Sequence, residues 1–209
     1  MEDLIIVGTG IHALETAEIV ERINRDKPVW RLLGYIHLDN EHPKTPELNG
    51  YPVLGGPDTA LNYPNAYFAH CFKSKITQVP HDRWATIIDP SVFVSRTAQI
   101  GRGCIVFPNG YIGVNAVLGD FVFCLSGVIV NHDDVIGNDT SLTSGVIIAG
   151  ETTIGSRCYI GQGSNIRQKL TIGDDCFIGM GAVVIRDVPP NSVMVGNPAR
   201  WLRENNPTQ

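Results

Sequence analysis

Residues 142–166 read "LTSGVIIAGETTIGSRCYIGQGSNI", and every sixth position of this stretch, from the first, carries Leu or Ile. The same spacing continues in both directions, from residue 88 to residue 184. The seventeen residues at these positions are all apolar: Ile88, Val94, Ile100, Val106, Ile112, Leu118, Cys124, Val130, Ile136, Leu142, Ile148, Ile154, Ile160, Ile166, Ile172, Ile178 and Val184. In a chain with 43% apolar residues, chance gives such a series with a probability of about 10⁻⁶. The repeat is therefore a structural signal.

A period of six fits neither an α-helix nor the simple alternation of a strand, but it suits a short strand followed by a turn. The residue after the apolar position is often glycine, and the fifth residue of most hexads is small. Three such units close a triangular coil of about eighteen residues, and stacked coils are spaced by about 4.8 Å. We therefore expect an all-β parallel β-helix of about five coils, with the repeated apolar residues pointing inward.

Charge and composition exclude several classes of protein. The net charge of −5 and the pI of about 5.6 give no reason to expect a surface for nucleic acid or for an anionic membrane. The first residues, MEDLIIVGTG, have no basic segment, and their apolar run is too short for a signal peptide or a membrane span. We expect a cytoplasmic protein.

The cysteines and histidines of the repeat indicate neither disulfides nor a metal site. The chain has five cysteines, an odd number, and no CxxC pair. Cys104, Cys158 and Cys176 occupy small fifth positions, so we interpret them as buried packing residues. A zinc site needs several converging nitrogen or sulfur ligands, and His132 is the one histidine in the repeat. We expect no metal.

The hexad that begins at Val130 continues with Asn131, His132, Asp133 and Asp134, an unusual polar cluster in an apolar repeat. In the predicted coils, Gly150 follows His132 in the same column, and an exposed imidazole beside a glycine N–H suits a general base with an oxyanion donor. Either Asp133 or Asp134 could hold the imidazole tautomer. A solvated corner without chemistry explains the spacing equally well, so both interpretations stay open at this point.

The hexads, the segment "NHDDVIG" and the closing "VMVGNPARWL" (residues 193–202) resemble the hexapeptide-repeat acyltransferases, which form left-handed β-helices and work as homotrimers. With the N-terminal "GTGIH", the chain is similar to the sugar acyltransferases of the UDP-4-amino-sugar N-acetyltransferase and sialic acid O-acetyltransferase type. The resemblance implies acetyl-CoA as co-substrate. It also implies that His132 takes the proton from the acceptor and that Asp133 raises its basicity.

The resemblance also assigns residues to the coenzyme A site. Carried over by position, Gly150, Gln162 and Met180 line it, and Gln162 and Met180 share one corner column because they are eighteen residues apart. The family often has a second histidine near the thioester, nine residues after the catalytic one. This chain has Ser141 at that position, so the contact with the acyl donor differs here.

The first 85 residues form a different domain, which we expect to be a Rossmann-like half domain. The apolar strand 4–7 is followed by Gly8-Thr9-Gly10-Ile11-His12 and then by apolar residues at helical spacing. A strand, a glycine turn and a helix N-terminus form an anion site, but the segment is too short for the doubled dinucleotide fold, so NAD is not expected. We place the domains at residues 1–85 and 86–209.

In the resembled family this first domain holds the nucleotide-sugar acceptor. Gly10, Ile11 and His12 match the loop at the phosphates, while Asp39 and Asn40 match the end of the second strand, near the base. A further loop glycine of the relatives is replaced here by Cys71, so we expect the nucleotide to be bound differently.

Together these features predict an acetyl-CoA-dependent acetyltransferase that acts on an amino group of a nucleotide-linked sugar. Two alternatives remain at this level. The first is an O-acetyltransferase with a sialic-acid-like acceptor, and the second is a β-helix without catalysis that serves as a sugar-nucleotide sensor or scaffold.

Overall fold

The structure is a computed structural model that describes residues 1–39, 45–72 and 74–205. Asn40 lies outside the described residues. The chain divides into two compact units, Met1–Pro90 and Ser91–Gln209. No helix in the described residues is long and apolar enough to cross a bilayer.

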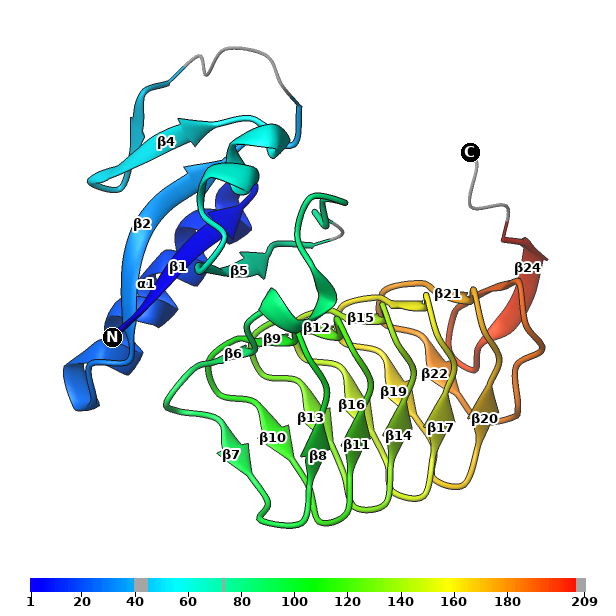
Figure 1. The fold of residues 1–209 in the computed structure, drawn as a ribbon. Helices are drawn as coiled ribbons and strands as arrows, with labels where there is room; N and C mark the ends of the chain where they lie inside the picture. The colour runs from blue at the N-terminus through cyan, green and yellow to red at the C-terminus, as the bar shows by residue number, and fades with distance from the viewer. Residues whose placement is uncertain (40–44, 73, 206–209) are drawn as a thin grey trace. The chain divides into compact units, whose positions relative to one another are not determined.

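The first unit is built on one sheet with the strand order β3-β4-β2-β1-β5 (Figure 1). Its elements are β1 (Glu2–Val7), α1 (Ile11–Asp26), β2 (Trp30–Ile36), β3 (Glu47–Leu48), β4 (Tyr51–Gly55), η1 (Pro57–Asn62), β5 (Tyr67–His70), η2 (His81–Arg83) and β6 (Ile87–Ile88). The pairs β1–β2, β1–β5 and β2–β4 are parallel, and β3 is antiparallel to β4. The parallel strands direct their carboxyl ends to one edge of the sheet, where ligands bind in open α/β sheets.

Burial explains why β1 and α1 form where they do. Leu4, Ile5, Ile6 and Val7 are fully buried, as expected of a central parallel strand covered on both faces. The residues buried on α1 are Ala13, Thr16, Ala17, Ile19 and Val20, which recur at helical spacing. The predicted strand–loop–helix start is therefore confirmed.

The second unit is a parallel β-helix. Its strands are β7 (Phe93–Val94), β8 (Gln99–Ile100), β9 (Ile105–Val106), β10 (Tyr111–Ile112), β11 (Val117–Leu118), β12 (Phe123–Cys124), β13 (Ile129–Val130), β14 (Val135–Ile136), β15 (Ser141–Leu142), β16 (Ile147–Ile148), β17 (Thr153–Ile154), β18 (Tyr159–Ile160), β19 (Asn165–Ile166), β20 (Thr171–Ile172), β21 (Phe177–Ile178), β22 (Val183–Val184), β23 (Ser192–Val195) and β24 (Arg200–Glu204). They form three faces, with the orders β22-β19-β16-β13-β10-β7, β20-β17-β14-β11-β8 and β24-β23-β21-β18-β15-β12-β9. Figure 1 shows the short strands of each face stacked in columns.

The register confirms the coil deduced from the hexads. Tyr111 pairs with Ile129, and Ile129 pairs with Ile147, so each strand lies against the one three hexads further on. From Ile112 to Val184, the inward residues of the hexads are at most 2% exposed. Such continuous stacking of apolar side chains is the interior that the repeat predicts.

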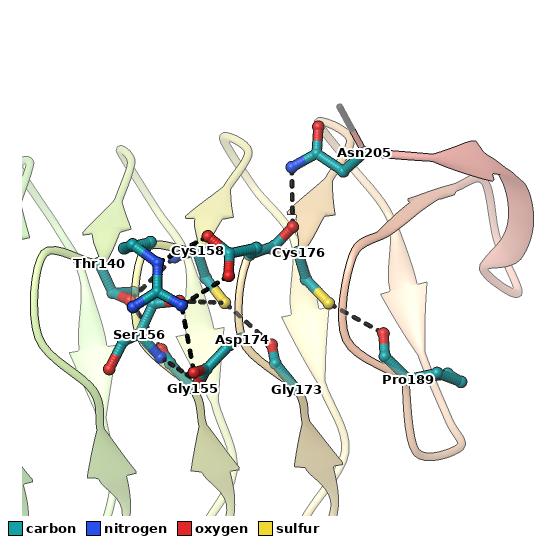
Figure 2. A network of polar contacts seen from close by, with 11 residues as sticks. Thr140, Gly155, Ser156, Cys158, Gly173, Asp174, Cys176, Pro189 and Asn205 are labelled. Carbon is teal, nitrogen blue, oxygen red and sulfur yellow. Dashed lines mark hydrogen bonds and ion pairs between the residues drawn. The ribbon is translucent and has the colours of Figure 1, made fainter. Parts of the chain in front are cut away.

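Turns and fifth positions complete each coil. The fourth residue of many hexads, such as Asn115 or Asp139, has φ near +60°, the left-handed conformation that Asn, Asp and Gly tolerate best. From Cys104 onward, the fifth residue of each hexad is buried; Figure 2 shows the column of Thr140, Cys158 and Cys176. The cysteine Sγ–H groups lie 3.2 Å from Gly173 O and 3.1 Å from Pro189 O. The five cysteines all lie in the described residues, are buried and form no disulfide, which agrees with a packing role.

The C-terminal segment covers the last coil. β23 continues the face of β21 in parallel, and β24 returns antiparallel to β23. The Asn205 side chain then donates a hydrogen bond to Asp175 O at 2.8 Å (Figure 2). The predicted end of the repeat after Val184 is thus a continuation of one face of the helix.

Candidate active site

His132 lies in the turn between β13 and β14, with 58% of its side chain exposed. Its Nδ1 is 2.9 Å from Asp133 Oδ2. The turn places these two consecutive residues side by side because Asp133 adopts φ 59°, which turns its side chain back toward the ring. The imidazole is therefore held on one nitrogen and open on the other.

The Asp133 carboxylate is held by two partners. Asn115 Nδ2, one coil earlier, donates to Asp133 Oδ1 at 3.0 Å, while Oδ2 faces His132. The hydrogen bond from Asn115 and, to a smaller extent, the one with His132 lower the pKa of Asp133 below its ordinary value. An ionised carboxylate only accepts hydrogen bonds, so we assign the imidazole proton to Nδ1. His132 Nε2 then carries the lone pair that a general base needs.

Gly150 lies in the turn one coil further on, directly against the imidazole. A Cβ at residue 150 would be 2.6 Å from both Cε1 and Nε2 of His132. Among the residues that the structure describes, no acceptor is found for the Gly150 N–H. A basic nitrogen and a free N–H donor thus lie together at one corner, the arrangement that the column predicts.

Asp134 does not contact the imidazole nitrogen that Asp133 holds. Its side chain is fully buried, and its two oxygens accept the backbone N–H groups of Asn131 and Thr152. Burial raises the pKa of Asp134 to about 6, against the lowering effect of these two donors. Of the two acidic residues left open by the sequence, Asp133 is the partner of His132.

Apart from Gly150, the residues expected to hold coenzyme A lie elsewhere on the same chain. Gln162 and Met180 share one corner column, because Gly181 N donates to Gln162 O at 2.8 Å, and Met180 is 74% exposed. This corner is at the opposite edge of the β13 face from His132. Ser141 is on another face, in β15, and is only 3% exposed. Within one chain, the structure groups His132 with Gly150 but with none of these three.

The candidate acceptor residues line a pocket of about 450 Å³ in the first unit. Its lining includes the described residues predicted from the sequence: Gly10, Ile11, His12, Asp39 and Cys71. Gly10 is the N-cap of α1, and no side chain caps this end of the helix. The pocket therefore opens at a helix N-terminus, where backbone N–H groups attract anions such as phosphates.

Two pocket residues are held by neighbours. His12 Nδ1 is 2.9 Å from Glu15 Oε2, which fixes the ring beside the glycine loop. The Cys71 Sγ–H lies 3.6 Å from Thr16 Oγ1, and burial raises the pKa of this thiol to about 12. The Cys71 thiol is thus neutral and lines the pocket rather than acting as a nucleophile.

Among the pocket residues that the sequence analysis did not assign are three polar ones: Thr9, His37 and Ser74. Thr9 Oγ1 and His37 Nδ1 are 3.4 Å apart, across the carboxyl ends of β1 and β2. His37 immediately follows β2, and polar residues at that end of a parallel strand are a signal that could have been used.

Comparisons with known proteins agree with this fold. Residues 88–185 match the family described as GMPPB C-terminal domain. No curated protein matched the chain. Among solved structures, the acetyltransferase domain of PglB from Neisseria gonorrhoeae is 25% identical with a TM-score of 0.82, covering 97% of this chain and 100% of that one. Its complex with acetyl coenzyme A is 26% identical with a TM-score of 0.81, covering 96% and 99%.

PerB from Caulobacter crescentus, solved with CoA and GDP-perosamine, is 24% identical and has a TM-score of 0.82. The similarity covers 97% of this chain and 98% of PerB, so the likeness includes both units. The hexad repeat, the N-terminal unit and these similarities together lead to one conclusion. Over both units, the chain is similar to hexapeptide-repeat sugar acetyltransferases such as the PglB acetyltransferase domain.

Proposed function

We propose that this protein transfers the acetyl group of acetyl-CoA to an amino group of a nucleotide-linked sugar. The observation that carries the proposal is the His132 corner. There, an exposed imidazole is held on Nδ1 by an ionised carboxylate, and it lies against Gly150, whose N–H has no acceptor among the described residues.

The chemistry follows from that geometry. The amine nitrogen of the acceptor attacks the thioester carbonyl carbon, and a C–N bond forms while the carbonyl oxygen gains negative charge. The Gly150 N–H donates to this oxygen, and His132 Nε2 takes the proton that the amine loses. The C–S bond then breaks, and the proton passes from Nε2 to the thiolate, which leaves as free CoA. Asp133 keeps Nε2 basic and stabilises the imidazolium between these two transfers.

The pocket of the first unit is the proposed site for the nucleotide part of the acceptor. Gly10, Ile11 and His12 would bind the diphosphate at the α1 N-terminus, and Asp39 is proposed to contact the nucleoside. Support comes from the pocket's position at the carboxyl ends of β1 and β2. PerB, which shares the fold, was solved with a nucleotide sugar, GDP-perosamine.

A homotrimer is part of the proposal. Gln162 and Met180 are separated from His132 by the face of β13, so the acyl donor would be held by these residues of a second copy. The outward side of that face exposes apolar side chains: Phe93 and Tyr111 are stacked with centroids 5.0 Å apart, and Ile147 is 38% exposed. A neighbouring copy of the chain would cover them. Light scattering coupled to gel filtration would measure the mass, and a monomer would remove this part.

The test is a panel of acceptors assayed with acetyl-CoA. Thiol release is followed with UDP- and GDP-linked amino sugars, with sialic acid as a hydroxyl acceptor, and mass spectrometry identifies the product. We expect release only with an amino sugar nucleotide, and an acetylated product of the matching mass. Tight binding of a nucleotide sugar without release from any acceptor would favour the sensor, and release with sialic acid alone would favour O-acetylation.

A further inference from the structure

Asp134 occupies a position at which this repeat otherwise avoids charge. The fifth residues of the other hexads are Val92, Ala98, Cys104, Gly110, Ala116, Val122, Val128, Thr140, Val146, Thr152, Cys158, Ser164, Leu170, Cys176 and Ala182. None of these carries a charge, whereas Asp134 places a carboxylate there with 0% exposure. Burial of a carboxylate is costly unless hydrogen bonds compensate it. Its contacts therefore indicate what it does.

The two carboxylate oxygens bond to the two turns that carry the site. Oδ2 accepts the N–H of Asn131, the residue before His132, at 2.8 Å. Oδ1 accepts the N–H of Thr152, two residues after Gly150, at 2.9 Å. One side chain thus links the turn of the imidazole to the turn of the proposed oxyanion donor, one coil away.

These bonds supplement a ladder bond that is longer here than in a neighbouring coil. The ladder distance from Asn131 N to Ile148 O is 3.3 Å, against 2.9 Å from Gly113 N to Val130 O. The Asn131 side chain instead donates to Ile148 O at 2.7 Å. The carboxylate and this amide therefore join the two turns in addition to the backbone bonds there, from Glu151 N to His132 O at 3.0 Å and from Val135 N to Thr152 O at 2.9 Å.

We infer that Asp134 is a positioning residue, which sets the imidazole of His132 against Gly150 by tying the two turns together. The inference rests on the proposed function of His132. The ring is already in close contact with Gly150, so a small change in the spacing of the two turns displaces Nε2 relative to the N–H donor. Errors of about 1 Å in the placement of catalytic groups can cost about 10²-fold in rate.

The matched control is Thr140, at the fifth position of the next hexad. Its Oγ1 accepts the N–H of Cys158 across one coil at 3.1 Å, a tie of the same kind at a different corner (Figure 2). Asp134→Ala removes both bonds of the carboxylate. Asp134→Thr introduces the residue type that accepts a backbone N–H across one coil at position 140. It lacks the second oxygen, which accepts the N–H of Asn131 in the wild type.

The first measurement needs no substrate. Crystal structures of the full chain are compared for the wild type, Asp134→Ala and Thr140→Ala. We expect the His132 ring to move or to occupy more than one conformation in Asp134→Ala and to stay in place in Thr140→Ala. An unmoved, single ring position in Asp134→Ala would overturn the inference, whether or not an acceptor is ever found.

The second measurement uses whichever acceptor the panel identifies. For folded protein we expect Asp134→Ala to lower kcat by about tenfold to a hundredfold with KM for acetyl-CoA within about twofold. Asp134→Thr should recover part of this loss, and Thr140→Ala should keep the wild-type kcat while losing thermal stability. If Asp134→Ala does not fold, Asp134→Thr decides: a kcat equal to that of the wild type would contradict a positioning role. Failure of the wild type with every acceptor would instead refute the proposed function.

Discussion

Adding one methyl group at Gly150 should displace the imidazole of His132. The new Cβ would lie 2.6 Å from Cε1 and Nε2 of His132, whereas non-bonded carbon atoms prefer about 3.5–4.0 Å. The ring must therefore retreat by about 1 Å. Gly150 is not in the left-handed backbone region, but the new Cβ would also lie 2.9 Å from the backbone oxygen of His132, so the turn must give by a few tenths of an ångström. A misplacement of this size is expected to cost about 10²-fold in kcat, or about 2.7 kcal/mol of transition-state stabilisation.

The assay is steady-state thiol release by purified Gly150→Ala, with Gly110→Ala as the control variant. A Cβ at residue 110 meets its nearest neighbours at 3.4 Å, so that methyl is accommodated. Because the N–H of residue 150 is retained, the loss should act through His132. Gly150→Ala should then add little in a His132→Ala background. A Gly150→Ala activity within about threefold of wild type, or full additivity with His132→Ala, would refute the reasoning.

Three further outcomes are expected. Gly10→Asp should leave the melting temperature unchanged or raise it, because aspartate is a favoured N-cap residue. The same variant should weaken UDP or GDP binding, measured by calorimetry, by about tenfold because its carboxylate repels the phosphates. Gly10→Ser is the uncharged control, and equal affinities of the two variants would count against a phosphate-binding role of this loop. Burial raises the pKa of Asp134 to about 6, so its favourable contribution is present below its unfolded value near 3.8 and is lost as pH rises through 6. In urea unfolding, the free energy of unfolding of Asp134→Asn relative to wild type should therefore rise by about 2.5 kcal/mol between pH 4 and pH 7. His132 and Asp133 are common to both proteins, so a pH-independent difference would show that Asp134 does not titrate in this way. Ile148→Ala, inside the helix and fully buried, should destabilise the protein by about 2–5 kcal/mol, and a loss below about 1 kcal/mol would be inconsistent with a packed interior.

The sequence predicted the β-helix in detail because a single short period governs it. One apolar residue in six fixes the inward direction, and the coil length of three hexads follows. It also predicted that Gly150 would lie beside His132, since residues eighteen apart share a column. Which residues stack on one another in a β-helix follows from their separation in the sequence and needs no knowledge of side-chain contacts.

Side-chain roles inside the polar cluster could not be predicted in the same way. Spacing alone left both Asp133 and Asp134 open as the partner of His132, and only the family resemblance favoured Asp133. The structure separates them by φ and burial, because Asp133 turns outward in the left-handed conformation while Asp134 enters the coil. The low exposure of Ser141 and the pocket residue His37 were also not foreseen, since both depend on packing between segments distant in sequence.

The central claim is that His132 acts as the general base of an acetyl transfer from acetyl-CoA. Its most direct test is kcat for the His132→Ala variant, beside His81→Ala as a control at another exposed histidine, together with the affinity of each protein for CoA. We predict a loss of about 10²–10⁴-fold in His132→Ala alone, with CoA affinity preserved. A His132→Ala enzyme that turns over its acceptor within about threefold of the wild-type rate would contradict the account.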